Sequence, residues 1–298
     1  MNKIEFRSGN SEYEFIKEHI EKELYTNKKI ICYVDSLPPE NIKKKNDEIW
    51  VFIQVESYYI LSHIYSEVKN YPFDVFLMFT TCVNRPGFYK FFPYNKVYWI
   101  KPGYHFIKNL NLPNLSPIKY LPRDKKLFVS MLCGEKNWAP GHQFRRKIWD
   151  YQKNMTFPKK FRYSQNYGDL KLFDDNKKIS HSKDKTELFI DSMFHIAIEN
   201  NQATDYFTEK LIDCFVSMTI PIYYGCPNIG DYFDIRGMII VNDMNDINNL
   251  NNIISEKFYK DRITFIEDNY CRVLNRPSFK EQFIQIMNKK YEINIEER

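Results

Sequence analysis

The stretch FHIAIENNQATDYFTEKLIDCFVSMTIPIYYG, residues 194–225, alternates two short apolar runs with an amphipathic segment. The runs at 194–198 and 220–224 are rich in Ile, Phe and Tyr and have the length of buried strands. Between them, apolar residues recur with helical spacing at Leu211, Ile212, Phe215 and Met218. A strand, a helix and a second strand in this order predict a parallel pair joined by a right-handed crossover.

The same alternation continues on both sides of this unit. Further strand-like runs lie at 29–34, 49–53, 73–79, 127–132 and 238–241. Helical patterns lie at 143–153 and 278–291. Strands that alternate with helices in this way predict an α/β protein with parallel sheets.

A proline-rich segment separates the strands into two groups. Residues 101–124 contain four prolines, which forbid a long helix and favour a linker or a set of turns. We therefore predict an N-terminal domain at 1–122 and a C-terminal domain at 123–276. The amphipathic helix within 277–298 is expected to pack back toward the N-terminal domain.

The composition is that of a folded chain without a strongly basic surface. Hydrophobic residues make up 43% of the chain, far more than in disordered proteins. The net charge of +5 is modest and the lysines are scattered, so a nucleic-acid partner is not expected. No cysteine stands in a C-x-x-C pair, so we expect reduced, mostly buried thiols.

No stretch approaches the ~20 apolar residues that span a bilayer, and the start of the chain is polar. These features predict a cytoplasmic protein without a membrane span. Glycine-rich phosphate loops of the common types are also missing from the sequence. Any phosphate must then be held by other groups.

The loop after the 194–198 strand offers such groups. Thr208 is a good N-cap for the following helix, so the positive end of that helix should face the loop and attract a phosphate. Lys210, in the first turn, is unfavourable for the helix itself, which suggests a partner such as a diphosphate. The alternative is that Glu209 and Lys210 are an ordinary solvated first turn.

The whole segment resembles the donor-binding signature of the α1,3/α1,4-fucosyltransferase family. The family's pattern is a strand, a Glu-Asn pair, a loop that ends in Tyr-x-Thr-Glu-Lys, a helix, and a strand of the type Pro-Ile-x-x-Gly. Those identities stand here in order at Glu199, Asn200, Tyr206, Thr208, Glu209, Lys210, Pro221, Ile222 and Gly225. So many identities at matching spacings make the resemblance specific.

The resemblance implies roles for these residues. Lys210 would lie at the diphosphate of a GDP-sugar, and Glu209 would accept hydrogen bonds from the ribose hydroxyls. The resemblance also places Asn200, Tyr206 and Thr208 in the donor site. Glu199 is a strand-end carboxylate that could simply orient the neighbouring loops.

The family also has an arginine at the start of an upstream helix, which adds a second positive charge at the diphosphate. Here Arg145 or Arg146 could match it, and we favour Arg145. A plain basic helix face is the alternative.

In the N-terminal domain, Glu56 matches the strand-end glutamate that is the proposed catalytic base in the family. Glu67 and Asp74 compete for this role. Tyr58 stands where the family has proline, and Asn95 where it has glycine. These departures concern the acceptor side more than the donor side.

The resemblance implies two Rossmann-like domains of the GT-B type facing a cleft, in a microbial or viral type of enzyme without an anchor. The implied activity is an inverting glycosyltransferase that moves fucose from GDP-fucose to a hydroxyl of an acceptor glycan. No Asp-x-Asp pair occurs, so we expect no metal and no other cofactor. Alternatives are transfer from another GDP-hexose or deoxyhexose, or a non-catalytic nucleotide- or carbohydrate-binding protein.

Overall fold

The structure of the chain, a computed structural model, describes residues 2–8, 24–26, 28–55, 58–78, 94–99, 125–164, 168–179, 185–277, 279–291 and 296–297. It divides into two compact units, one of residues 1–102 with 277–298 and one of residues 103–276. The predicted linker at 101–124 lies outside the described residues.

The first unit is built on a parallel sheet with the strand order β2-β4-β5-β6-β7. Its strands are β2 (Glu5–Ser8), β4 (Lys29–Val34), β5 (Glu48–Gln54), β6 (Val75–Met78) and β7 (Val97–Trp99). β4, β5 and β6 are almost entirely buried, which explains why they read as continuous apolar runs. The strands predicted at 29–34 and 49–53 are confirmed, and the run predicted at 73–79 contains the shorter strand Val75–Met78, with residue 79 outside the described residues.

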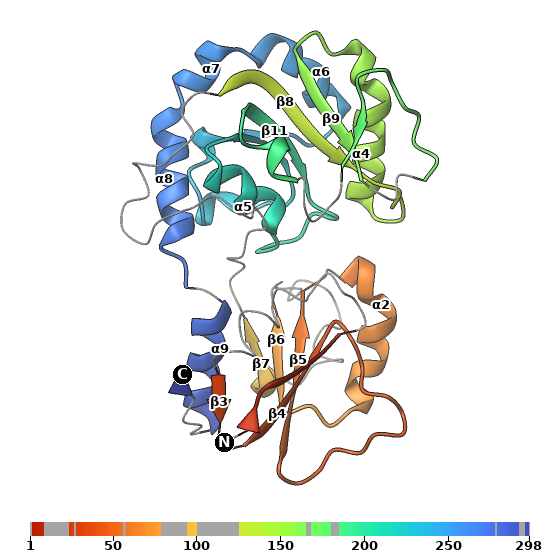
Figure 1. Cartoon of the computed structure of the whole chain (residues 1–298), viewed down its shortest axis with the longest axis vertical. Helices are drawn as coiled ribbons and strands as arrows, with labels where there is room; N and C mark the ends of the chain where they lie inside the picture. The colour runs from red at the N-terminus through yellow and green to blue at the C-terminus, as the bar shows by residue number, and fades with distance from the viewer. Residues whose placement is uncertain are drawn as a thin grey trace. The chain divides into compact units, whose positions relative to one another are not determined.

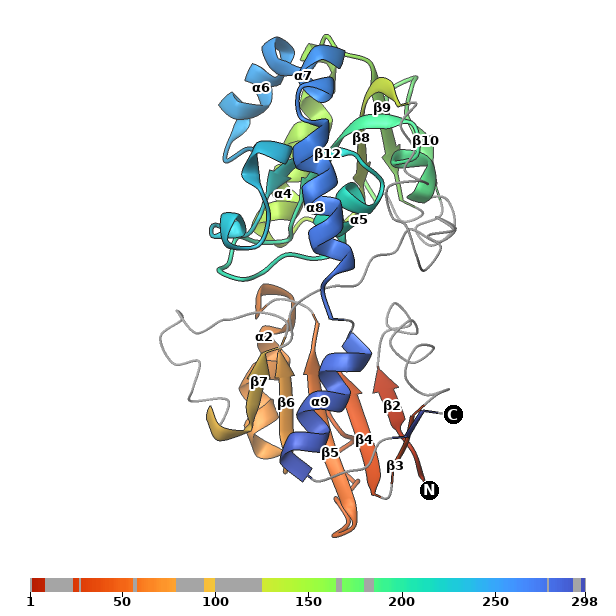
Figure 2. The ribbon, with the colours of Figure 1, turned by 90° about the vertical axis from the view of Figure 1, so that its left-hand side faces the viewer.

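Two of the described helices cover the faces of this sheet (Figures 1 and 2). α2 (Tyr58–Glu67) connects β5 to β6 and packs Ile64 and Tyr65 against Trp50 and Phe52. α9 (Phe279–Tyr291), from the far end of the sequence, lies on the other face. There the ring centres of Phe283 and Phe6 lie 6.4 Å apart. A small antiparallel sheet of β1 (Asn2–Lys3), β3 (Leu24–Thr26) and β14 (Glu296–Glu297) completes the unit.

The second unit contains a six-stranded parallel sheet with the order β10-β9-β8-β11-β12-β13. Its strands are β8 (Lys126–Cys133), β9 (Lys159–Tyr163), β10 (Lys177–Lys178), β11 (Ser192–Ile198), β12 (Ile220–Tyr224) and β13 (Ile239–Ile240). Its described helices are α4 (Pro140–Tyr151), α5 (Glu209–Val216), α6 (Met244–Ile253), α7 (Glu256–Lys260) and α8 (Ile263–Leu274).

The strand order of the second unit reverses direction between β8 and β11. From β8 the chain moves outward through β9 to β10, and from β11 it moves outward on the other side through β12 to β13. Because parallel crossovers are right-handed, α4 and α5 lie on opposite faces of the sheet. The carboxyl ends of β8 and β11 therefore form a topological switch point, where ligands of open α/β sheets bind.

The structure corrects one predicted boundary. The helix expected at 143–153 begins at Pro140 and gives way to a 3-10 turn after Tyr151. Pro140 stands in the first turn, where a proline lacks no hydrogen bond and its φ already suits a helix. The segment between β8 and this helix is thus shorter than the sequence suggested.

Candidate functional site

The residues after β11 and the first turns of α4 and α5 meet at the switch point of the second unit. β11 ends at Ile198, so Glu199 and Asn200 stand directly at its carboxyl end. Thr208 is the N-cap of α5, and Arg145 lies in the second turn of α4. We refer to residues 199–208, which join β11 to α5, as the β11–α5 loop.

Glu199 fixes the start of α5. It is fully buried, and its Oε1 accepts a hydrogen bond from Thr208 N at 2.7 Å. Its Oε2 accepts a second one from Thr208 Oγ1, also at 2.7 Å. Burial raises the pKa of Glu199. The contacts of Glu199 are therefore those of a residue that orders the loop.

Asn200 links the loop to α4. Its Oδ1 accepts a hydrogen bond from Nη2 of Arg145 at 2.7 Å, and its carbonyl oxygen accepts one from Gly141 N at 2.9 Å. A Cβ on Gly141 would lie 1.7 Å from the carbonyl oxygen of Glu199. Only glycine allows this close approach.

The two candidate arginines have different surroundings. Arg145 faces the loop, and burial lowers the pKa of its guanidinium. Arg146 instead pairs with Asp169 and donates to the carbonyl oxygen of Glu135 at 3.1 Å. The structure thus brings Arg145, and not Arg146, to the β11–α5 loop.

Lys210 has carboxylate partners of its own chain. Its Nζ lies 3.0 Å from Oε1 of Glu209 and 3.7 Å from Oε2 of Glu199. It also donates to Thr208 Oγ1 at 3.1 Å. The sequence suggested a cation that needs an external partner, whereas the structure shows one held among oxygens of the loop and the first turn of α5.

Glu209 is ionised at neutral pH. Burial pushes its pKa upward, but the charges of Lys210 and Lys185 outweigh this and lower the pKa of Glu209 to about 2. Lys185, in a 3-10 turn before β11, is itself paired with the buried Asp213 of α5 at 2.6 Å. Sequence reasoning missed Lys185, because its partner lies 28 residues further along the chain and no local pattern connects the two.

His142 is a second residue that the sequence did not reveal. It is buried in the first turn of α4, and its Nδ1 accepts a hydrogen bond from Ala139 N at 3.3 Å. Burial, together with the charges of Arg145, Lys136 and Lys210, lowers the pKa of His142 to about 3. The imidazole is therefore neutral, with its proton on Nε2. The proline and glycine just before it are the signal that could have placed it at a helix start.

Two further buried side chains lie in the β11–α5 loop and in the sheet. Tyr206 is buried in the β11–α5 loop and contributes to the electrostatic environment of Arg145. His195 is buried within β11. Its Nδ1 lies 2.8 Å from Oγ of Ser130 in the buried core, and burial lowers its pKa to about 3.

The predicted catalytic base, Glu56, lies outside the described residues. Val55, just before it, directly follows the carboxyl end of β5. Its two competitors lie at the other edge of the sheet. Glu67 ends α2, which runs back from β5, and Asp74 precedes β6. Asp74 is already paired with Lys44 at 2.6 Å and accepts from the Trp50 amide at 2.8 Å.

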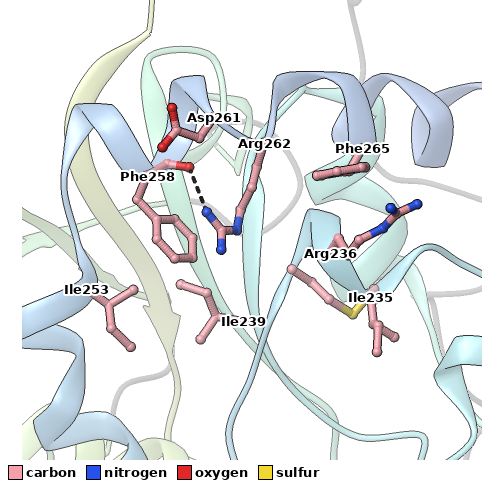
Figure 3. Close-up of a pocket in the computed structure, with 9 residues that line it drawn as sticks. Ile235, Arg236, Ile239, Ile253, Phe258, Asp261, Arg262 and Phe265 are labelled. Carbon is pink, nitrogen blue, oxygen red and sulfur yellow. Dashed lines mark hydrogen bonds between the residues drawn. The ribbon is translucent and has the colours of Figure 1, made fainter.

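A separate pocket of about 440 Å³ lies between β13 and the α7–α8 corner (Figure 3). Ile239, Ile253, Phe258 and Phe265 give it apolar walls. Arg262 lies with its guanidinium 3.5 Å from the centre of the Phe258 ring. The pocket shares no lining residue with the β11–α5 loop.

Over the described ranges, no group of three or more His, Cys, Asp or Glu side chains is arranged to hold a metal ion. Among the helices of that same part of the chain, none is both long enough and apolar enough to cross a membrane. The described cysteines are free thiols, and all of them except Cys271 are buried. The expected buried thiols are confirmed for those positions, and Cys82 lies outside the described residues.

Comparison with known proteins finds matches to the part of the chain that contains the β11–α5 loop. Residues 151–266 match the family model described as glycosyltransferase family 10 (fucosyltransferase), C-terminal part. The alpha-(1,3)-fucosyltransferase FucT of Helicobacter pylori is 30% identical over 108 residues, which are 36% of this chain and 22% of that protein. The predicted resemblance to the fucosyltransferase family is confirmed for this part of the chain.

The fold has solved counterparts. HepE from Anabaena, solved in complex with UDP-glucose, is 10% identical and covers 87% of this chain and 78% of its own, with a TM-score of 0.58. An alpha1,3-fucosyltransferase solved with GDP is 14% identical and covers 97% of this chain and 91% of its own, with a TM-score of 0.49. The HepE match and the two parallel sheets confirm the predicted fold class, α/β with two Rossmann-like units of the GT-B type.

Proposed function

We propose that this protein is an inverting glycosyltransferase that moves fucose from GDP-fucose to a hydroxyl of an acceptor glycan. The observation that carries the proposal is the convergence of Arg145 from α4 and Lys210 from α5 on one loop at the switch point. The family match over residues 151–266 supports the same activity.

The two cations suit a departing nucleoside diphosphate. Negative charge grows on the diphosphate as the glycosidic bond breaks, so fixed positive groups stabilise the transition state more than the ground state. Arg145 is pre-oriented by Asn200, and Lys210 is held by Thr208 and Glu209. A diphosphate oxygen would replace one carboxylate contact of Lys210 on binding. We propose that these groups act without a metal ion.

Glu209 suits the ribose of the nucleotide. A carboxylate accepts up to two hydrogen bonds from a vicinal diol, provided that it is ionised. The pKa of Glu209, lowered to about 2, keeps it ionised at every pH at which the protein is expected to work. Asn200 and Tyr206 complete the proposed donor site, and Glu199 orders the loop that carries it.

The acceptor side rests on Glu56. In the proposed reaction Glu56 removes the proton of the acceptor hydroxyl, and the oxygen attacks C1 of the sugar from the face opposite the departing GDP. One displacement inverts the configuration at C1. Binding of the donor therefore depends on the second unit and proton removal on the first.

The test is a panel of nucleotide sugars, including GDP-fucose, GDP-mannose and UDP-glucose, with release of the nucleoside diphosphate measured in the presence of candidate acceptor glycans. The proposal expects turnover that is fastest with GDP-fucose and dependent on the acceptor. Fastest turnover with GDP-mannose would change the donor sugar and keep the enzyme class. Binding of GDP without turnover of any donor would make this a non-catalytic nucleotide-binding protein.

A further inference from the structure

Arg276 is a half-buried cation that leaves part of its hydrogen-bonding capacity unused. It follows α8, and its backbone N donates to the carbonyl oxygen of Val273 at 3.2 Å. Its Nε and Nη2 are buried, and neither finds a hydrogen-bond partner among the residues that the structure describes. Burial lowers the pKa of Arg276 to about 10, so the guanidinium is still charged at neutral pH.

Three aromatic rings surround this guanidinium. Its central carbon lies 4.8 Å from the ring centre of Phe207 and 5.6 Å from those of Tyr232 and Phe233. The rings also contact one another, since Phe207 lies 5.0 Å from Tyr232 and 5.4 Å from Phe233. Attraction between the cation and the faces of the rings offsets part of the cost of its burial.

One of these rings belongs to the β11–α5 loop and another bonds to it. Phe207 immediately precedes Thr208, the N-cap of α5. The hydroxyl of Tyr232 donates to Oδ1 of Asp205 at 2.6 Å, and Nδ2 of Asn228 donates to the same oxygen at 2.7 Å. Asp205 has a φ of 59°, in the left-handed region that non-glycine residues adopt at a cost. Such a conformation persists only where surrounding contacts enforce it.

An uncharged side chain of similar length would fill the same space without burying unpaired donors. The charge of Arg276 attracts the faces of the three rings, and an uncharged side chain in the same space would lack this attraction. Two of those rings are connected to the loop. Phe207 immediately precedes Thr208 in the chain, and the hydroxyl of Tyr232 donates a hydrogen bond to Asp205.

We propose that Arg276 is a positioning residue that clamps the rings of Phe207 and Tyr232 and thereby holds the β11–α5 loop in its ligand-binding conformation. Arg276 need not contact the nucleotide to do this. The consequence for nucleotide affinity rests on the proposed function, whereas the ordering of the loop does not. Loss of the clamp should free the loop without unfolding α5 or the sheet.

The first measurement is amide hydrogen exchange on the ligand-free chain. The amides of Asp205, Tyr206 and Thr208 report on the loop, because their hydrogen-bond acceptors are Asn228, Ala203 and Glu199 respectively. In Arg276→Met these amides should exchange about tenfold faster than in the parent protein, since local opening controls exchange. Arg276→Lys keeps the charge but loses the flat stacking surface, so it should fall between the two.

The matched control is Arg262→Met, which removes an arginine stacked on Phe258 in the pocket of Figure 3. It should leave exchange of the β11–α5 loop unchanged. GDP binding, measured by calorimetry, should weaken several-fold in Arg276→Met and remain within twofold in Arg262→Met.

Parent-like loop exchange in Arg276→Met would overturn the proposal and reduce Arg276 to a packing residue. If Arg276→Met does not fold, amide exchange in Arg276→Lys provides the test. Parent-like exchange of the loop in that variant would show that the flat guanidinium is not needed and would also overturn the proposal. If the parent protein does not bind GDP, the proposed function fails, and the exchange experiment still tests the clamp.

Discussion

Arg145 in α4 and Asn200 after β11 are joined by one hydrogen bond, from Nη2 to Oδ1 at 2.7 Å. The bond crosses the switch point, because α4 follows β8 and Asn200 follows β11. It therefore ties together the two halves of the second unit at the place where a ligand would bind. Its acceptor is an amide oxygen, so the full positive charge of Arg145 remains available to an incoming anion.

Arg145 and its neighbour Arg146 provide an adjacent pair of test and control. Arg145→Met removes the guanidinium that faces the loop and should weaken GDP binding about 10- to 100-fold, as expected for losing a hydrogen bond to a charged group. Arg146→Met removes an arginine that pairs with Asp169 away from the loop and should change GDP affinity less than about twofold. Calorimetry on both variants checks this, and equal effects would remove Arg145 from the proposed site.

GDP should bind without a divalent metal and more tightly than UDP or CMP. The proposed site supplies its own positive charges through Arg145 and Lys210, so a metal ion is not needed to neutralise the diphosphate. Calorimetric titrations of the three nucleotides, each with EDTA and with added Mg²⁺, measure both points. An absolute requirement for metal, or equal affinity for UDP, contradicts the GDP assignment.

Lys210→Ala should weaken GDP binding by about tenfold or more and also lower kcat. In the proposed site, one ammonium group would contact both the ground-state diphosphate and the more highly charged leaving group, so both quantities should respond. Lys257→Ala is the control, because that lysine is exposed on α7 and pairs with Asp261 one turn away. If the two lysine variants behave alike, the ammonium of Lys210 serves only its own carboxylates.

The fold was largely readable from the sequence where strands are buried on both faces. β4 and β12 have the predicted bounds, because their apolar runs are uninterrupted. β9 was missed because Phe161 is its only fully buried residue and lysines and arginine flank it. α6 was missed as well, since its sequence is rich in Asn and only Ile247 and Leu250 anchor it in the core.

The candidate site was readable only where its residues are close in sequence. The β11–α5 loop carries a continuous pattern, so Asn200, Thr208 and Lys210 could be proposed directly. His142 and Lys185 gave no such signal, because burial and distant partners determine their electrostatic effect. Which of two adjacent arginines faces the loop depended on the true start of α4, and proline placement fixes that start only to within a turn.

His142 should make folding stability depend on pH. Its pKa is about 3 in the folded chain and 6.5 ordinarily, so between these values the unfolded chain binds the extra proton. Stability is thus fully present above about pH 6.5 and falls as the pH drops, by about 1 kcal/mol between pH 7.5 and 5.5. Urea unfolding of the parent and of His142→Gln at both pH values measures how much His142 contributes to the pH dependence of the free energy of unfolding. Equal pH dependence in the two proteins argues against a buried neutral His142.

Glu56→Gln is the sharpest test of the proposed reaction. The change is nearly isosteric, and it keeps hydrogen bonding but removes the ability to accept a proton. General-base catalysis typically contributes about 10² to 10⁴-fold, so kcat should drop by roughly that factor. GDP affinity and the thermal midpoint should stay near those of the parent protein, because the proposed donor site lies in the other unit.

Glu67→Gln and Asp74→Asn complete this experiment. Both carboxylates lie at the amino edge of the first sheet, whereas Glu56 comes after β5 in the sequence and lies outside the described residues. Glu67→Gln should leave kcat unchanged, since Glu67 is exposed at the end of α2. Asp74→Asn should lower the thermal midpoint through lost contacts with Lys44 and the Trp50 amide, with little effect on kcat of the folded protein. If Glu56→Gln transfers sugar at the parent rate, the base is another residue. If it loses GDP binding instead, Glu56 belongs to the donor side.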